Sequence, residues 1–212
     1  MALLMAGLTG RLADIAWRLA RLGRAGGGRA FGVPAIWLGW ERLDLWRTAR
    51  RYGLPYAQPG SITRYAPKTY AGPPLVLRDG ALVRPGDRIL ELHLDNRAIL
   101  RLATTSRQWP SWIALRLFAE DLDALARRVR DGEFEGVAAI RGLTLLTVPA
   151  RRLGFDVRPL PRTWGPRLLH FYLVGLVAIY HPHGWRGAAY MRQAAWPGEV
   201  WMSIDGLLRR RE

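Results

Sequence analysis

The segment "GDRILELHLDN", residues 86–96, carries three side chains whose types and spacing could do chemistry. Because side chains alternate along a strand, Glu91, His93 and Asp95 share one face and the intervening leucines face the other way. Carboxylates about 7 Å away on either side can fix the tautomer of a histidine and stabilise its charged form. That geometry suits a general base, a metal ligand or a sugar site, to which Asn96 at the strand end could contribute. It suits equally the solvated face of an antiparallel sheet, which is the interpretation we favour.

Two further histidines, His181 and His183, flank Pro182 in an expected loop. With His93 they could supply the three imidazoles that zinc accepts, provided that the fold brings them together. The sequence does not show that convergence, so we predict no metal site and leave any cofactor open. His181 and His183 are kept as candidate ligand-binding residues, whereas His170 lies in an apolar run and is expected to be a satisfied core histidine.

Common catalytic motifs are missing from the sequence. There is no G-x-S-x-G, H-E-x-x-H or phosphate-loop lysine motif, and no G-x-G-x-x-G follows an expected strand. The chain has no cysteine, which excludes thiol nucleophiles, disulfides and cysteine-based metal sites. Any catalysis would therefore depend on the same row, with His93 as the base and Glu91 or Asp95 orienting it.

The residue pattern from position 61 onward predicts an α+β fold. "ITRYA", "PLVLRDGALVR" and the segment at 86–96 predict a short antiparallel meander, in which Asp79-Gly80 forms a two-residue hairpin turn. Alternating strands and helices then predict a mixed α/β layer with several helices. Ser203 is expected to cap a terminal helix, with Asp205 in its first turn. The remaining elements are expected as helices at 95–103, 111–130, 143–154 and from 166, and strands at 135–142, 155–160 and 199–203.

Residues 1–60 are expected to form an N-terminal helical extension, separate from an α+β domain at 61–212. Residues 8–23 have the spacing of an amphipathic helix with one apolar and one basic face, and a glycine-rich break follows at 23–32. We favour packing of this helix on the protein's own core. The alternative is peripheral contact with an anionic membrane surface.

Composition limits the remaining classes of function. The chain has 212 residues, of which 50% are hydrophobic, so it can bury a substantial core. The net charge of +15 comes from 32 basic residues, of which only Lys68 is a lysine. GC-rich coding DNA produces such an arginine bias, so nucleic-acid binding is not the interpretation we favour. No apolar run is long enough to span a bilayer and we read no signal peptide, so we expect a protein that is cytoplasmic or peripheral to the membrane.

Several blocks taken together resemble one family of bacterial domains. In order they are "GPPLVLRDGALVRPGDRILELHLDN" at 72–96, "GVAAIRGLTLLTVPARRLGFDVRPLP" at 136–161, "YHPHG" at 180–184 and "EVWMS" at 199–203. They are similar to the YkoP-like domain, over roughly residues 60–211. Such domains occur alone or behind the catalytic domain of predicted polysaccharide deacetylases. The resemblance implies a role in cell-envelope polysaccharide metabolism, with a polysaccharide or sugar as ligand and a deacetylase as partner.

The deacetylase chemistry itself is not expected here, because the chain lacks the T-F-D-D and H-x-x-x-H motifs of those catalytic domains. The leading hypothesis is a binding or accessory module, with the strand end from Glu91 to Asn96 as its ligand-facing surface. The alternative is a small acyl- or glycosyl-transferring enzyme that uses His93. A third hypothesis is a basic protein that binds a membrane surface or nucleic acid.

Overall fold

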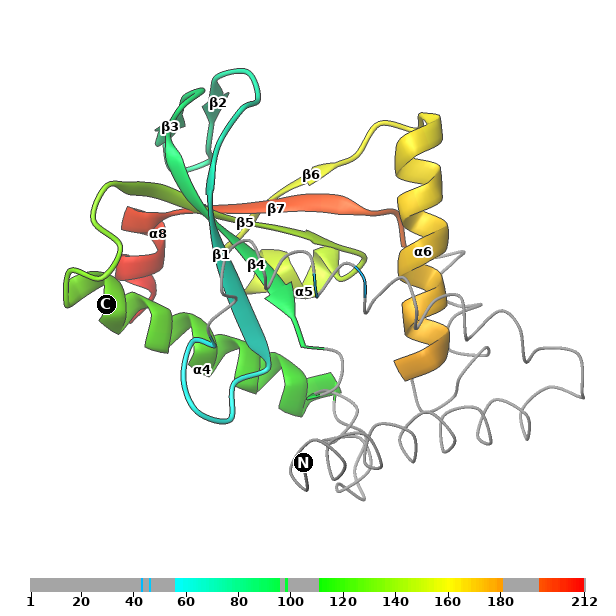
Figure 1. The fold of residues 1–212 in the computed structure, drawn as a ribbon, viewed down its shortest axis with the longest axis horizontal. Coiled ribbons are helices and arrows are strands. Elements are labelled where there is room, and N and C mark those ends of the chain that lie inside the picture. The colour runs from blue at the N-terminus through cyan, green and yellow to red at the C-terminus, as the bar shows by residue number, and fades with distance from the viewer. Residues whose placement is uncertain are drawn as a thin grey trace, which may run out of the picture.

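The computed structural model describes residues 56–95, 98, 111–180 and 195–211, together with Leu43 and Trp46. These residues form a five-stranded mixed sheet, a separate two-stranded sheet and several helices, which confirms the expected α+β class (Figure 1). The helices are α4 (Ser111–Arg130), α5 (Thr147–Arg152), α6 (Trp164–Tyr180) and α8 (Ile204–Leu208), followed by a 3-10 turn at Arg209–Arg211. The expected extension at 1–60, with its helix at 8–23, lies almost entirely outside the described residues.

The five-stranded sheet has the spatial order β1-β4-β5-β7-β6. Its strands are β1 (Thr63–Thr69), β4 (Arg88–Leu94), β5 (Val137–Thr144), β6 (Asp156–Pro159) and β7 (Gly198–Ser203). Strand β4 pairs in parallel with β5, and the long crossover between them contains α4. The pairs β1–β4, β5–β7 and β6–β7 are antiparallel. This order brings side chains from five separate parts of the chain onto one sheet face.

The first three predicted strands are arranged differently from a simple meander. β1 and β4 pair directly, and the chain between them forms a separate hairpin of β2 (Leu75–Val76) and β3 (Leu82–Val83), which extends beyond the sheet (Figure 1). The Gly80 N–H donates to the Leu77 carbonyl and the Leu77 N–H to the Ala81 carbonyl, so the turn contains three residues rather than the predicted two. Gly80, with φ +85°, occupies the position that needs a left-handed backbone, and a glycine there fits both turn lengths.

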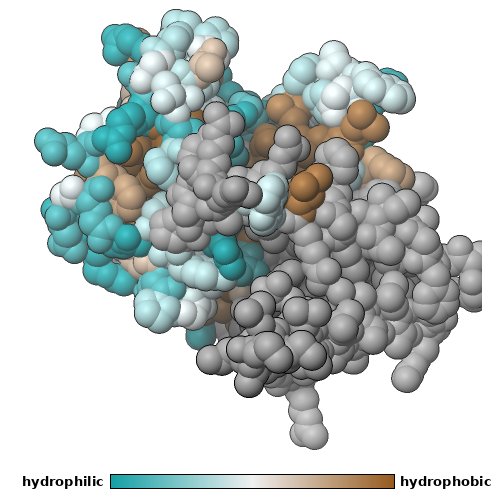
Figure 2. All heavy atoms as spheres, viewed as in Figure 1, coloured by the Kyte–Doolittle hydropathy of each residue, from teal (hydrophilic) through white to brown (hydrophobic). Residues whose placement is uncertain are grey.

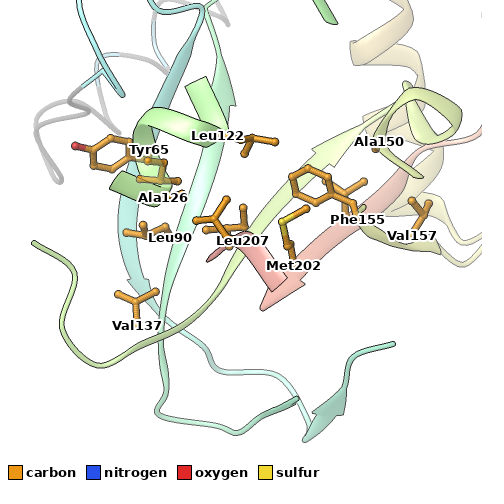
Figure 3. Packing of buried hydrophobic residues seen from close by; sticks show 13 residues of the cluster. Tyr65, Leu90, Leu122, Ala126, Val137, Ala150, Phe155, Val157, Met202 and Leu207 are labelled. Carbon is orange, nitrogen blue, oxygen red and sulfur yellow. The ribbon is translucent and has the colours of Figure 1, made fainter. Parts of the chain in front are cut away.

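One sheet face packs against α4, α5 and α8 to form the main core (Figure 3). On α4, Leu122, Leu125 and Ala126 are buried at helical spacing and meet Leu90 and Ile140 from the central strands. Burying each such leucine or isoleucine stabilises the fold by about 2 kcal/mol. The core therefore fixes which face of β4 is apolar, and Glu91 and His93 must lie on the opposite face.

Most predicted elements are confirmed, with shifts at their ends. The helix at 111–130 and the strands at 155–160 and 199–203 lie where expected. Strand β5 continues to Thr144, so the helix expected from 143 begins only at Thr147, with Pro149 in its first turn, where a missing N–H costs little. His170 is only partly buried and stacks on Trp196 with ring centroids 5.1 Å apart, rather than lying in the core.

Ser203 joins the sheet, the terminal helix and the hairpin. Its side chain accepts a 2.7 Å hydrogen bond from the Gly206 N–H, which confirms the expected N-cap of α8. The same hydroxyl donates to the Asp79 carboxylate, which also accepts from Arg209 at 3.1 Å. The turn residue Asp79 therefore holds the β2–β3 hairpin against the C-terminal end of the described chain.

Replacing Ser203 with alanine should lower the free energy of unfolding by about 1–2 kcal/mol, because the cap and the bond to Asp79 are lost together. Urea denaturation followed by circular dichroism measures this change. Val148→Ala, at an exposed position of α5, serves as the control and should change the value by less than about 0.5 kcal/mol. An equal effect of the two substitutions would contradict this role of Ser203.

Candidate functional site

The sheet face opposite the main core carries a row of charged side chains, which we call the ionic face. The strand register places every second residue of each strand on it, so that Arg64 lies opposite His93, and Glu91 lies beside Arg141. Apolar residues of the β2–β3 hairpin cover only one end of this face, where they pack on Ile89 and Trp201. The ionic face comprises Arg64, Lys68, Glu91, His93, Asp95, Arg141, Asp156, Arg158 and Glu199.

Glu91 lies at the centre of the ionic face, and its side chain is only 14% exposed. Lys68 Nζ, from β1, donates to Oε1 of Glu91 at 2.7 Å. Nε2 of His93 lies 3.3 Å from the same oxygen, and Arg141 Nη1, from β5, lies 3.6 Å from Oε2. Arg141 in turn donates to Glu199 of β7, which also accepts from the Trp201 indole. Charges of alternating sign therefore run across four neighbouring strands.

The surroundings of Glu91 lower its pKa. Burial raises the pKa, but the contacts with His93 and Lys68 outweigh burial and bring it to about 2, from an ordinary 4.5. Glu91 is therefore a fixed negative charge at neutral pH. A carboxylate with so low a pKa is a poor general base, but it can hold a neighbouring imidazole in one orientation.

Asp95 forms hydrogen bonds with three groups from outside β4. It accepts hydrogen bonds from the Tyr56 hydroxyl at 2.6 Å, from Arg64 at 3.0 Å and from the Ala98 N–H at 3.0 Å. Burial raises its pKa, but these hydrogen bonds outweigh burial and lower it. These contacts tie the residues before β1 to the chain that leaves β4, so they give Asp95 a structural function.

Three strands of the ionic face each carry one buried arginine Nε atom that has no hydrogen-bond partner. These atoms belong to Arg64, Arg141 and Arg158. The three residues belong to the described part of the chain, and another nitrogen of each guanidinium group does have a partner, as in the bond from Arg158 to the Val76 carbonyl. A buried donor without a partner costs about 1–3 kcal/mol. Acceptor oxygens of a bound molecule would recover this energy.

The formal charges on the ionic face balance. Four cationic side chains, of Arg64, Lys68, Arg141 and Arg158, face four carboxylates, of Glu91, Asp95, Asp156 and Glu199. With His93 neutral, the face has no net charge, although the whole chain carries +15. A face of this kind offers donors and acceptors in fixed positions without attracting a polyanion.

The structure brings together only part of the predicted site. Glu91 and His93 are in contact, and Asp95 is engaged by Tyr56, Arg64 and the Ala98 N–H. Asn96, His181 and His183 lie outside the described residues. The regions that the structure does describe contain no group of three or more histidine, aspartate or glutamate side chains arranged to hold a metal ion.

Sequence reasoning missed the cations of the ionic face. Arg64 and Arg141 each lie between two buried residues along their own strand. That alternation is a usable signal for the side of the strand on which a residue lies. Which strands are neighbours depends on the crossover through α4, and that information is not present in any one segment.

The chain thus forms an α+β domain with a charged face on its main sheet. In a comparison with family models, the YkoP domain matches residues 32–211. The chain therefore belongs to the YkoP domain family, as the resemblance of its blocks predicted. The match begins earlier than the residue 60 at which that resemblance became clear. Searches of curated proteins and of solved structures gave no match.

Replacing Glu91 with glutamine should lower the free energy of unfolding at pH 7 by about 2 kcal/mol, because Lys68 and Arg141 lose their shared counterion. The pKa of Glu91 is lower in the folded chain than in the unfolded one. Its stabilisation is therefore complete above pH 4.5 and is lost as the pH falls toward 2. Glu91→Gln should consequently flatten the loss of stability over this interval, as measured by urea denaturation at several pH values.

The matched control for this prediction is Glu120→Gln on α4. Glu120 forms an exposed pair with Arg116 one helical turn away, and such pairs contribute little to stability. This variant should keep the acid profile of the parent protein. If Glu91→Gln also keeps it, the central position assigned to Glu91 is wrong.

Proposed function

We propose that this YkoP domain protein is a binding or accessory module that recognises a neutral polysaccharide of the bacterial cell envelope on its ionic face. The observation that carries the proposal is the set of three buried arginine Nε donors without partners on a face whose charges balance. The expected family association with polysaccharide deacetylases supports a sugar as the class of ligand. A deacetylase would then be the partner that acts on the bound polysaccharide.

A sugar suits this face for a physical reason. Hydroxyl and amide oxygens accept hydrogen bonds from guanidinium and imidazole N–H groups without bringing a net charge that Glu91 and Glu199 would repel. Neutral ligands also lack the counterions whose release favours binding of polyanions to basic proteins. Binding through this face should therefore depend weakly on salt.

A second candidate is a small transferase in which His93 accepts a proton from the sugar hydroxyl or amine that attacks the donor. The 3.3 Å contact between His93 Nε2 and Glu91 favours it, because a fixed carboxylate beside an imidazole can hold the ring in one orientation. Asp95 has no part in this version, since its contacts with Tyr56, Arg64 and the Ala98 N–H give it a structural function. Mass spectrometry of chitosan hexamer incubated with acetyl-CoA and the protein would detect such transfer, and a product that His93→Gln cannot form would favour the enzyme.

The binding proposal is tested by calorimetry with two neutral sugars, chitohexaose, an N-acetylglucosamine hexamer, and cellohexaose, a glucose hexamer. His93→Ala and Arg158→Met should each weaken binding about tenfold, the effect of losing roughly one hydrogen bond. The affinity of the parent protein should change less than about twofold between 50 and 500 mM salt, because no net charge is involved.

Arg116→Met provides the matched control, since Arg116 is an exposed arginine on α4, the helix that packs on the opposite sheet face. It should bind the sugars as the parent protein does. Binding that His93→Ala and Arg158→Met leave unchanged, or that neither neutral sugar shows, would contradict the proposal.

A further inference from the structure

Helix α6 presents an apolar stripe to solvent. Trp164, Leu168 and Phe171 are spaced at i, i+4 and i+7, which places them on one side of the helix. Their side chains are 74%, 51% and 59% exposed. We call these three residues the α6 stripe. Figure 1 places α6 on the side of the view away from β1, and Figure 2 shows hydrophobic side chains in that region.

The other side of α6 already packs against the protein. Val174 is buried against Leu145, which follows β5, and His170 stacks on Trp196, which precedes β7. The helix is therefore anchored to the sheet through Val174 and His170, while Trp164 and Leu168 remain more than half exposed. Exposed apolar residues grouped in this way indicate an interaction surface.

The chain around the stripe is basic and almost without acidic residues. Between residues 145 and 197 the sequence contains seven arginines and one carboxylate, Asp156, which pairs with Arg158 at 3.3 Å on the ionic face. Arg162 and Arg167 are exposed close to the stripe, at the start of α6. With Arg158 and Asp156 set aside as members of the ionic face, six arginines and no carboxylate remain in this part of the sequence.

An apolar stripe that contains tryptophan and is bordered by arginines is the pattern of a surface that enters the headgroup region of an anionic bilayer. None of the helices in the described ranges is long and apolar enough to cross a membrane, so the expected contact is with the membrane surface. We propose that the α6 stripe docks the protein onto an anionic lipid surface. This contact is separate from the ionic face and does not depend on the sugar proposal.

The absence of cysteine allows a site-specific test on the full chain. Leu168→Cys, labelled with an environment-sensitive nitrobenzoxadiazole dye, reports whether this position enters lipid. Val76→Cys is the matched control, because Val76 is an apolar residue of similar exposure on the β2–β3 hairpin. Both proteins are titrated with phosphatidylcholine vesicles that contain either no phosphatidylglycerol or a substantial fraction of it.

The expected result is a blue shift and a rise in fluorescence at position 168 with the phosphatidylglycerol vesicles, and no change at position 76. No shift at 168, or an equal shift with vesicles of pure phosphatidylcholine, would overturn the proposal. Equal shifts at 168 and 76 would also overturn it, because they indicate non-specific adsorption.

A second measurement uses unlabelled protein. In co-sedimentation with the phosphatidylglycerol vesicles, Trp164→Ser combined with Leu168→Ser should weaken binding roughly tenfold or more, because two apolar side chains no longer leave water. Val76→Ser should bind as the parent does. If the double variant also binds as the parent does, the contact with the membrane lies elsewhere, for example in residues 8–23, and the α6 proposal fails.

Discussion

A carboxylate in the middle of a sheet face constrains everything around it. Glu91 is largely withdrawn from water, so the strands on both sides of β4 must supply cations to it. Lys68 on β1 and Arg141 on β5 meet this need, and Arg141 then requires Glu199 on β7. The strand order is thus matched by a sequence of alternating charges. A shift of register by one residue would place Glu91 in the main core, so these contacts select one pairing of the strands.

The same alternation builds both faces of the sheet. Leu90 and Ile140 point toward α4, while their neighbours Glu91 and Arg141 point to the ionic face. Apolar burial on the first face supplies most of the stabilisation, and the ion pairs on the second face mainly specify the arrangement of the strands. The β2–β3 hairpin belongs to this arrangement too, because Asp79 at its turn is tied to Ser203 at the end of β7. One end of the ionic face is consequently covered, and the end near His93 is not covered by the hairpin.

Local patterns predicted the elements well, because each depends on a few consecutive residues. Helix α4 and the cap at Ser203 follow from helical periodicity and from hydroxyl chemistry, and both are confirmed. The contacts of Asp95 could not be predicted, because Tyr56 and Arg64 reach it from a distant part of the sequence. For the same reason, the sequence predicted that Glu91 and His93 share a face but did not predict that Lys68 and Arg141 would contact Glu91. A strand shows which residues share its face, but neighbouring strands decide what those residues contact.

The positions of the carboxylates show where positive charge is left uncompensated, which the number of arginines alone does not. A genome-wide bias toward arginine would raise the positive charge everywhere, yet the ionic face is neutral because each cation there has an acidic neighbour. Within the part of the chain that the structure describes, the exposed Arg162 and Arg167 at the start of α6 form no ion pair with a carboxylate, so this end of the helix carries uncompensated positive charge. A single chain can in this way hold a neutral polar ligand on one surface and attract an anionic surface with another. The two proposed contacts share no residue, because the ionic face is formed by the strands of the main sheet and the stripe by α6.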